Sequence, residues 1–139
     1  MTHVILTKSF TKNPEAGNPA GVVTDAQDLS DAHILKLAQA LGFPESAFLQ
    51  KSTVADYKLR LFSVKQEVNS CVTATLAAAA VTTNQSTPQV TFETKIGNRE
   101  VHRRDDGLLL MKQPPVEFLG EQTNRPRIAE LLNIPVKDL

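Results

Sequence analysis

The sequence predicts an α+β domain in which a mostly antiparallel or mixed sheet curls around a central helix. Two observations support this class. Short segments rich in β-forming residues recur along most of the chain, and only three segments carry helical spacing. One of these, residues 71–82, contains four consecutive alanines at 77–80 and is apolar nearly all round. Such a helix is typical of one surrounded by other elements, because no side of it suits water.

Composition restricts the function classes. The 139 residues suit one domain, residues 1–139, with no linker and no apparent internal repeat. Fifteen basic and fifteen acidic side chains cancel, so no overall field favours nucleic acid or an anionic membrane. No apolar run approaches the length of a membrane span, and no secretory leader is evident. We therefore expect a cytoplasmic protein without nucleic-acid or membrane partners.

Metal and disulfide chemistry find little support. A single cysteine, Cys71, excludes an internal disulfide framework and a cysteine-rich zinc site. The three histidines lie far apart and lack ligand spacing. We therefore expect no metal site.

Alternating or continuous apolar runs predict the strands. Their ranges are 3–10, 20–24, 46–51, 56–63, 89–94, 99–104 and 108–111. Ser30 is expected to cap a helix over 31–41 that Gly42 ends. Asn69 or Ser70 is expected to cap the alanine-rich helix, and Asn124 the last one, which has Pro126 in its first turn.

Glu45 is the first candidate for chemistry. It falls between the end of a helix and the start of a strand, among apolar neighbours. Partial desolvation there raises a carboxyl pKa towards the range of a general acid or base. An exposed loop glutamate is the alternative interpretation.

The start of the alanine-rich helix is the second candidate. Free N–H groups and the helix dipole favour an anion at such an end, and they are expected to lower the pKa of Cys71. The alternative is a small buried residue, since free cysteine is often buried. A third stretch, Gly17-Asn18-Pro19, is by itself only a turn.

Together these stretches resemble the PhzF-like (phenazine biosynthesis) family. The shared features are a phenylalanine followed by Gly-Asn-Pro and a small apolar strand, then a Glu-Ser motif, then an acidic residue ahead of the alanine-rich helix. The matching ranges, in chain order, are 9–11 with 15–23, 29–31, 45–48, 56–63 and 67–76. The rest of the chain fits in pattern more than in motif.

The resemblance implies one N-terminal lobe of the diaminopimelate-epimerase-like fold. In that fold two lobes, each a sheet curled around a helix, enclose an active site. Similar proteins are isomerases that shift a proton on a small acid without metal or organic cofactor. The resemblance makes Glu45 the acid/base residue and Cys71 a second catalytic candidate. It also implies substrate binding by Asn18, Ser46, Val72 and Thr73.

Two departures bear on activity. Val72-Thr73 stands where the family usually has Gly-His, so a proton-carrying histidine is replaced and bulk is added. The family's second lobe, which supplies an aspartate and a Gly-Ser anion site, is not in this sequence. We expect a homodimer or a separately encoded second lobe to complete the cleft. A non-catalytic module that binds a small acid or a protein, a truncated pseudoenzyme, is the alternative.

Overall fold

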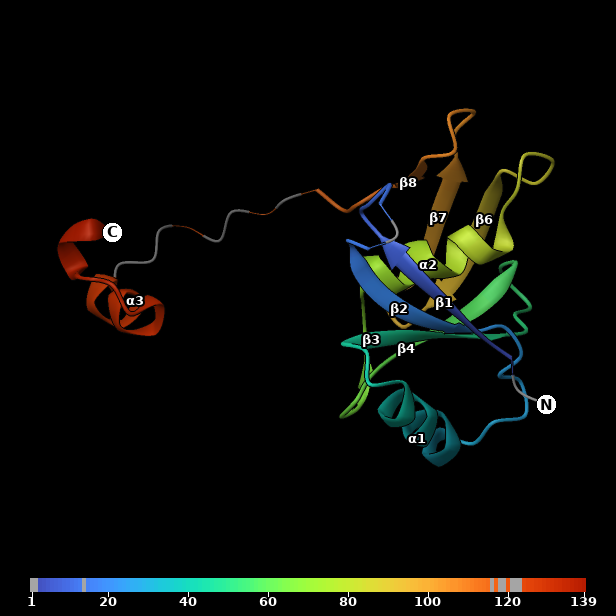
Figure 1. The fold of residues 1–139 in the computed structure, drawn as a ribbon, viewed down its shortest axis with the longest axis horizontal. Coiled ribbons are helices and arrows are strands. Elements are labelled where there is room, and N and C mark those ends of the chain that lie inside the picture. The colour runs from blue at the N-terminus through green and yellow to red at the C-terminus, as the bar shows by residue number, and fades with distance from the viewer. Residues whose placement is uncertain (1–2, 14, 116, 118–119, 121–123) are drawn as a thin grey trace.

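The computed structural model describes residues 3–13, 15–115, 117, 120 and 124–139 (Figure 1). Over these residues the chain forms strands, three α-helices and one short 3-10 helix. They are β1 (Val4–Ser9), β2 (Asn18–Val23), α1 (Asp31–Leu41), β3 (Glu45–Gln50), β4 (Tyr57–Ser63), β5 (Glu67–Val68), α2 (Val72–Thr82), β6 (Gln89–Thr94), β7 (Gly97–Arg103), β8 (Leu109–Met111), α3 (Arg125–Leu132) and η1 (Val136–Asp138).

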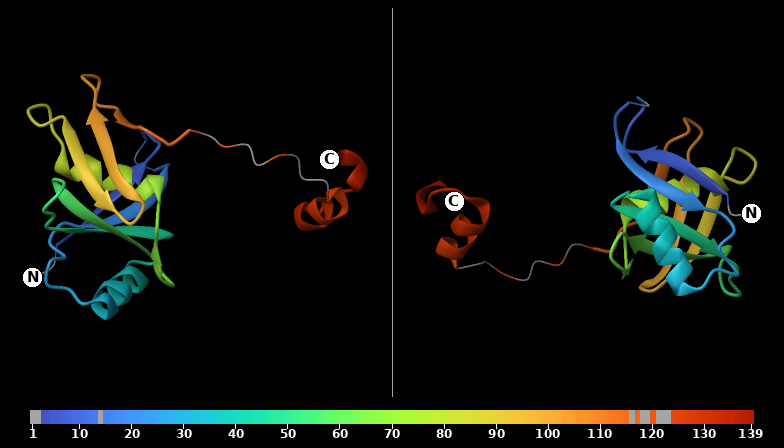
Figure 2. Two further views of the ribbon diagram at one scale, coloured as in Figure 1. Left: turned by 180° about the vertical axis from the view of Figure 1, so that it is seen from behind. Right: turned by 60° about the horizontal axis from the view of Figure 1, so that its bottom comes forward.

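The strands form one mixed sheet that curls around α2 (Figure 2), as the sequence predicts. Their order is β1-β2-β3-β4-β6-β7-β8, with β5 paired to β4. Two neighbouring pairs, β2–β3 and β4–β6, are parallel, and the others are antiparallel. The two-residue β5 carries too short a pattern to be predicted from the sequence.

Helix α2 is the centre of the main core. Its buried alanines, Ala74 and 77–79, contact strand residues from both halves of the sheet. Because alanine carries one methyl group, the sheet backbone approaches the helix closely on several sides. The strand side chains of this core are Ala20, Val22, Ala47, Leu49, Leu59, Leu61, Val90, Phe92 and Val101.

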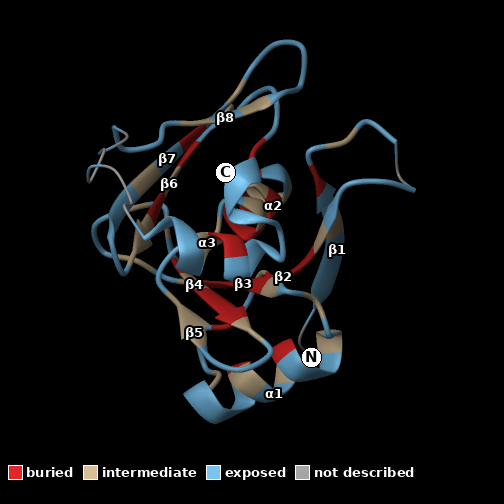
Figure 3. Cartoon of the chain, turned by 90° about the vertical axis from the view of Figure 1, so that its left-hand side faces the viewer, coloured by how far each residue is buried: buried red, intermediate tan, exposed pale blue. Residues whose placement is uncertain are grey.

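Helix α1 covers the opposite, outer face of the same sheet (Figure 3). Ile34 and Ala38 are buried there against Phe48 and Phe62. Successive strand residues point to opposite faces, so β3 and β4 contribute to both cores. Phe62 therefore packs against α1, on the other face of β4 from Leu59 and Leu61.

The predicted caps of α1 are confirmed, but that of α2 is wrong. The Ser30 hydroxyl accepts the N–H of His33, and Gly42 ends α1 at φ 69°. The N-cap of α2 is Cys71 rather than Asn69 or Ser70. Its sulfur accepts the N–H of Ala74 at 3.4 Å and so replaces the usual hydroxyl.

An ion-pair network ties α1 to the strands before α2. Arg60 donates two hydrogen bonds to Glu67, at 2.9 and 2.8 Å, and one to Asp31 at 2.8 Å. Lys95 reaches Glu67 at 2.8 Å, and the Arg60 guanidinium lies 5.1 Å from the centre of the Phe62 ring. The Arg60 hydrogen bonds lower the pKa of Glu67 to about 2, against the opposing effect of burial.

Helix α3 begins after Asn124, whose side chain accepts the N–H of Arg127, as predicted. In Figures 1 and 2 α3 and η1 lie apart from the curled sheet. Within the described ranges, no helix is long and apolar enough to cross a membrane.

We predict that replacing Ala78 by leucine destabilises the fold. Ala78 is fully buried, so the added side chain overfills the core, at a cost of about 1–3 kcal/mol in unfolding free energy. Urea denaturation measures the change. Ala80→Leu, at an exposed position of the same helix, is the matched control. Equal effects of the two changes would contradict a central position for α2.

We predict that Glu67→Gln lowers the unfolding free energy at pH 7 by about 2 kcal/mol, between the values for exposed and buried ion pairs. Because folding lowers the Glu67 pKa from 4.5 to about 2, this stabilisation is complete above about pH 5. It is lost as the pH falls towards 2, where the two proteins become equally stable. Denaturation at several pH values tests this, with the exposed Glu100→Gln as control; a difference that persists at pH 2 would rule out the linkage.

Candidate functional site

The structure brings the two predicted catalytic residues together. Glu45 is the first residue of β3, and Cys71 immediately precedes α2. The Cys71 thiol donates to Glu45 Oε2, with Sγ and Oε2 3.6 Å apart. Because α2 runs inside the curled sheet, its N-terminus meets the end of β3 that carries Glu45. Both side chains are half-buried.

The electrostatic environment keeps the thiol protonated. Burial raises the pKa of Cys71, and the neighbouring Glu45 carboxylate raises it further. The Ala74 N–H acts in the opposite direction but is outweighed. The lowered pKa that the sequence suggests for Cys71 is therefore wrong, because desolvation dominates over the helix end. The pair consists of a thiol donor and the carboxylate oxygen that accepts its hydrogen bond.

The first turn of α2 supplies further donors. The N–H groups of Val72 and Thr73 lie in this turn, where a helix has no internal acceptors. Thr75 Oγ1 donates to the Cys71 carbonyl at 2.7 Å, which holds the turn closed. The Val72 side chain is 37% exposed at the helix end. The N–H groups at a helix N-terminus favour an anion, and that of Thr73 also contacts the Cys71 sulfur.

The β1–β2 end lies against this helix turn. Ser9 donates its hydroxyl to the Thr73 carbonyl at 3.1 Å, and Ser9 pairs in register with Asn18. The exposed Asn18 therefore lies at the same end of the sheet as the α2 N-terminus. Gly17 precedes it at φ 88°, where a Cβ atom would lie 2.6 Å from the Ser9 carbonyl oxygen. The sequence did not indicate Ser9, whose position depends on this strand pairing.

Ser46 lies on the other face of the sheet from Glu45. The core residues of β3 show the alternation, since Ala47 belongs to the α2 core and Phe48 to the α1 core. Ser46 is fully buried, and a Cβ atom on Gly21 would lie 3.3 Å from its Oγ. Its hydroxyl is a buried polar group without a hydrogen-bond partner among the described residues. The structure thus groups Glu45 with Cys71 and the helix turn, and leaves the Ser46 side chain outside the group.

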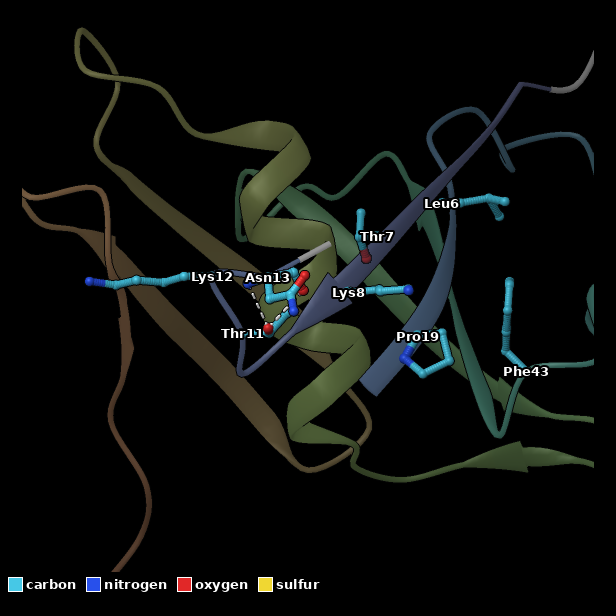
Figure 4. A pocket seen from close by; sticks show the side chains of 8 residues that line it. All are labelled: Leu6, Thr7, Lys8, Thr11, Lys12, Asn13, Pro19 and Phe43. Carbon is cyan, nitrogen blue, oxygen red and sulfur yellow. Dashed lines mark hydrogen bonds between the residues drawn. The ribbon is translucent and has the colours of Figure 1, made fainter. Parts of the chain in front are cut away.

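The larger hollows lie elsewhere on the lobe. One of about 480 Å³ runs along β1 between Leu6, Lys12 and Phe43 (Figure 4). Another of about 480 Å³ lies between β1 and β8 and reaches Leu76 of α2. Neither is lined by Glu45 or Cys71. In the described part of the chain, no three His, Cys, Asp or Glu side chains are grouped as metal ligands.

Comparison with known proteins first defines the fold class. The chain superposes on a predicted epimerase from Pseudomonas aeruginosa with a TM-score of 0.82, covering 100% of this chain and 53% of that one at 23% identity. A putative phenazine biosynthesis PhzC/PhzF protein from Clostridium difficile gives a TM-score of 0.76 at 30% identity, with 95% and 51% coverage. The fold is thus one lobe of the epimerase-like class.

Sequence comparison then gives the family. The family described as phenazine biosynthesis-like protein matches residues 7–136, and the chain belongs to it. An uncharacterized isomerase of Clostridium acetobutylicum is 35% identical over 141 residues, and one of Bacillus subtilis 30% over 142. These matches cover 94% and 97% of this chain but 47% and 48% of the relatives. The chain spans about half the length of the curated relatives it matches.

We predict that Glu45→Gln lowers the pKa of Cys71 but leaves it above the ordinary value, because burial is the larger cause. The rate of alkylation by iodoacetamide, measured against pH, reports this pKa without ambiguity because the chain has one cysteine. The exposed Glu15→Gln serves as a control. If the pH midpoint of alkylation is the same in Glu45→Gln and in the unaltered protein, the Glu45 carboxylate does not influence the pKa of Cys71, and the prediction is wrong.

Proposed function

We propose that this chain is the N-terminal lobe of a cytoplasmic, cofactor-independent isomerase that shifts a proton on a small carboxylic acid. The contact of 3.6 Å between Glu45 and Cys71, at the open turn of α2, carries the proposal. A carboxylate, a thiol and the backbone N–H groups of the first helical turn lie together there. These are the groups that proton abstraction from carbon requires.

Each group has a role in this proposal. The Glu45 carboxylate takes a proton from a carbon next to an electron-withdrawing group, and the C–H electrons remain on the substrate. The N–H groups of Val72 and Thr73 bind the substrate anion and stabilise the added charge. Protonated Glu45 returns the proton to another carbon, so the step is redox-neutral and regenerates the carboxylate. The Cys71 thiol holds the carboxylate by its hydrogen bond.

Substitution of the usual Gly-His by Val72-Thr73 changes the site. A threonine hydroxyl does not titrate near neutral pH, so Thr73 acts through its backbone rather than as a proton carrier. The half-exposed Val72 side chain narrows the approach to the helix end. This favours small substrates and assigns proton transfer to Glu45 alone.

A second lobe supplies the opposite wall of the cleft in this proposal. Glu45 and Cys71 line neither large hollow of the lobe, as expected for a site that one lobe only half encloses. A homodimer and a separately encoded lobe are the two candidates. In a catalytic homodimer the two Cys71 residues, each bonded to its Glu45, face one cavity. A separation of the two Cys71 residues well beyond about 10 Å would exclude it, because a general base must reach its proton directly or through one water.

Binding without catalysis is the second candidate function. Val72 in place of the expected glycine favours it, because the added side chain crowds the helix end. Such a module keeps the carboxylate-binding N–H groups and lacks proton exchange.

We predict that the assembled protein catalyses exchange of the α-hydrogen of a small amino or hydroxy acid with D₂O. Glu45→Gln is expected to slow it by about 100-fold or more, the contribution of a general base. Proton NMR of a panel of acids measures the exchange, and circular dichroism verifies folding. Glu15→Gln is expected to exchange normally. Exchange that survives Glu45→Gln would remove this residue from the mechanism, and binding without exchange would favour the second candidate.

A further inference from the structure

A third hollow, smaller and more enclosed than the other two, lies beside the start of α2. Strands β6, β7 and β8 lie along this side of the helix (Figure 3), and residues from or next to them line the hollow together with Leu61, Asn69, Ser70 and Thr75. Its volume is about 70 Å³, the space of about two water molecules. It therefore has room for one end group of a ligand, and the rest of a larger molecule would remain outside.

Arg99 of β7 contributes the charge of this hollow. It pairs in register with Phe92 and lies two residues from Val101. Phe92 and Val101 both belong to the α2 core, and strand residues that are directly opposite or two apart share a face. The half-buried Arg99 side chain is therefore on the α2 side of the sheet, where it lines the hollow.

The chain gives Arg99 no acidic partner within its described residues. Its guanidinium makes one hydrogen bond there, from Nη1 to the Asn98 carbonyl oxygen at 3.2 Å, and no ion pair. A guanidinium has five N–H donors, so most of them lack a protein acceptor among these residues. The acidic residues that flank Arg99 in the sheet, Glu93 and Glu100, alternate to the outer face. No acidic side chain lines the hollow.

Arg60 shows what an arginine with protein partners looks like in this fold. It lies on the outer face of the sheet, where two carboxylates, those of Glu67 and Asp31, accept its hydrogen bonds at 2.8 Å. Both arginines are partly shielded from water, but only Arg60 has its charge balanced by the described part of the chain. The contrast indicates that the counter-ion of Arg99 comes from outside the chain.

The other walls suit the anionic end of a small molecule. Leu61 and Met111 pack against the α2 core, and apolar walls strengthen an ion pair because they exclude water. The Thr75 hydroxyl already donates to the Cys71 carbonyl. The exposed side chains of Asn69 and Ser70 make no hydrogen bond among the described residues, so their amide and hydroxyl groups are further donors at the rim.

We propose that this hollow binds the carboxylate of a small organic acid and that Arg99 is the residue that recognises it. A carboxylate is planar and accepts two parallel hydrogen bonds from one guanidinium. The rest of the acid extends past Asn69 and Ser70, which directly precede Cys71. The site is distinct from the backbone N–H groups in the first turn of α2, and the inference does not require proton transfer by Glu45.

Titration of the isotope-labelled chain with sodium acetate, followed by NMR, tests the proposal. Sodium chloride is exchanged for acetate so that the ionic strength stays constant. Acetate is expected to shift the Nε–H signal of Arg99 and the backbone N–H signals of Asn69 and Ser70 in a saturable manner. Arg99→Gln removes the charge and is expected to weaken binding by about tenfold or more. Arg99→Lys keeps the charge without the planar fork and is expected to weaken it by about threefold.

Arg104→Gln is the matched control. The Arg104 side chain is 51% exposed and already forms an ion pair with Asp106, so its loss is expected to leave the acetate affinity unchanged. Circular dichroism verifies that each variant is folded, and the titration of the unaltered chain tests the site without any variant. Signals that do not saturate, the same affinity in Arg99→Gln as in the unaltered chain, or an equal loss in Arg104→Gln would overturn the proposal.

Discussion

The contact between the alanines of α2 and the curled sheet is the constraint on which the structure depends. Because Ala74 and residues 77–79 are small and fully buried, the sheet closes around the helix on both sides. This packing fixes the axis of α2, and with it the position of its first turn. The half-buried thiol of Cys71 lies where that axis meets the start of β3. The chemistry of the site is therefore a consequence of core packing.

The same packing explains the balance of charges at the site. A helix N-terminus by itself favours a thiolate, whereas a closed sheet removes the water that a thiolate needs. Glu45 adds a negative charge 3.6 Å away, which favours the neutral thiol still more. A thiol that keeps its proton is a poor nucleophile, so in the proposed site the carboxylate is the better candidate for the base.

Local patterns predicted most of the fold, since caps, turns and periodicity depend on neighbours in the sequence. Ser30, Gly42 and Asn124 act as predicted. The sequence also named Glu45 and Cys71, but their contact depends on pairing between segments far apart in the chain. The strand was expected to begin at residue 46, which left Glu45 in a loop. It begins at Glu45, and the two-residue alternation therefore turns Ser46 away to the outer face.

The burial of the two cores contrasts with the partial burial of the candidate site. The lobe covers both faces of β3 and β4 with its own helices. Glu45 and Cys71, by contrast, are only half-buried, at the N-terminal end of the helix. The resemblance sets Val72-Thr73 against a usual Gly-His pair. These two residues lie in the first turn of α2, so in the proposed site they alter the surroundings of Glu45 and leave the alanine packing of α2 untouched.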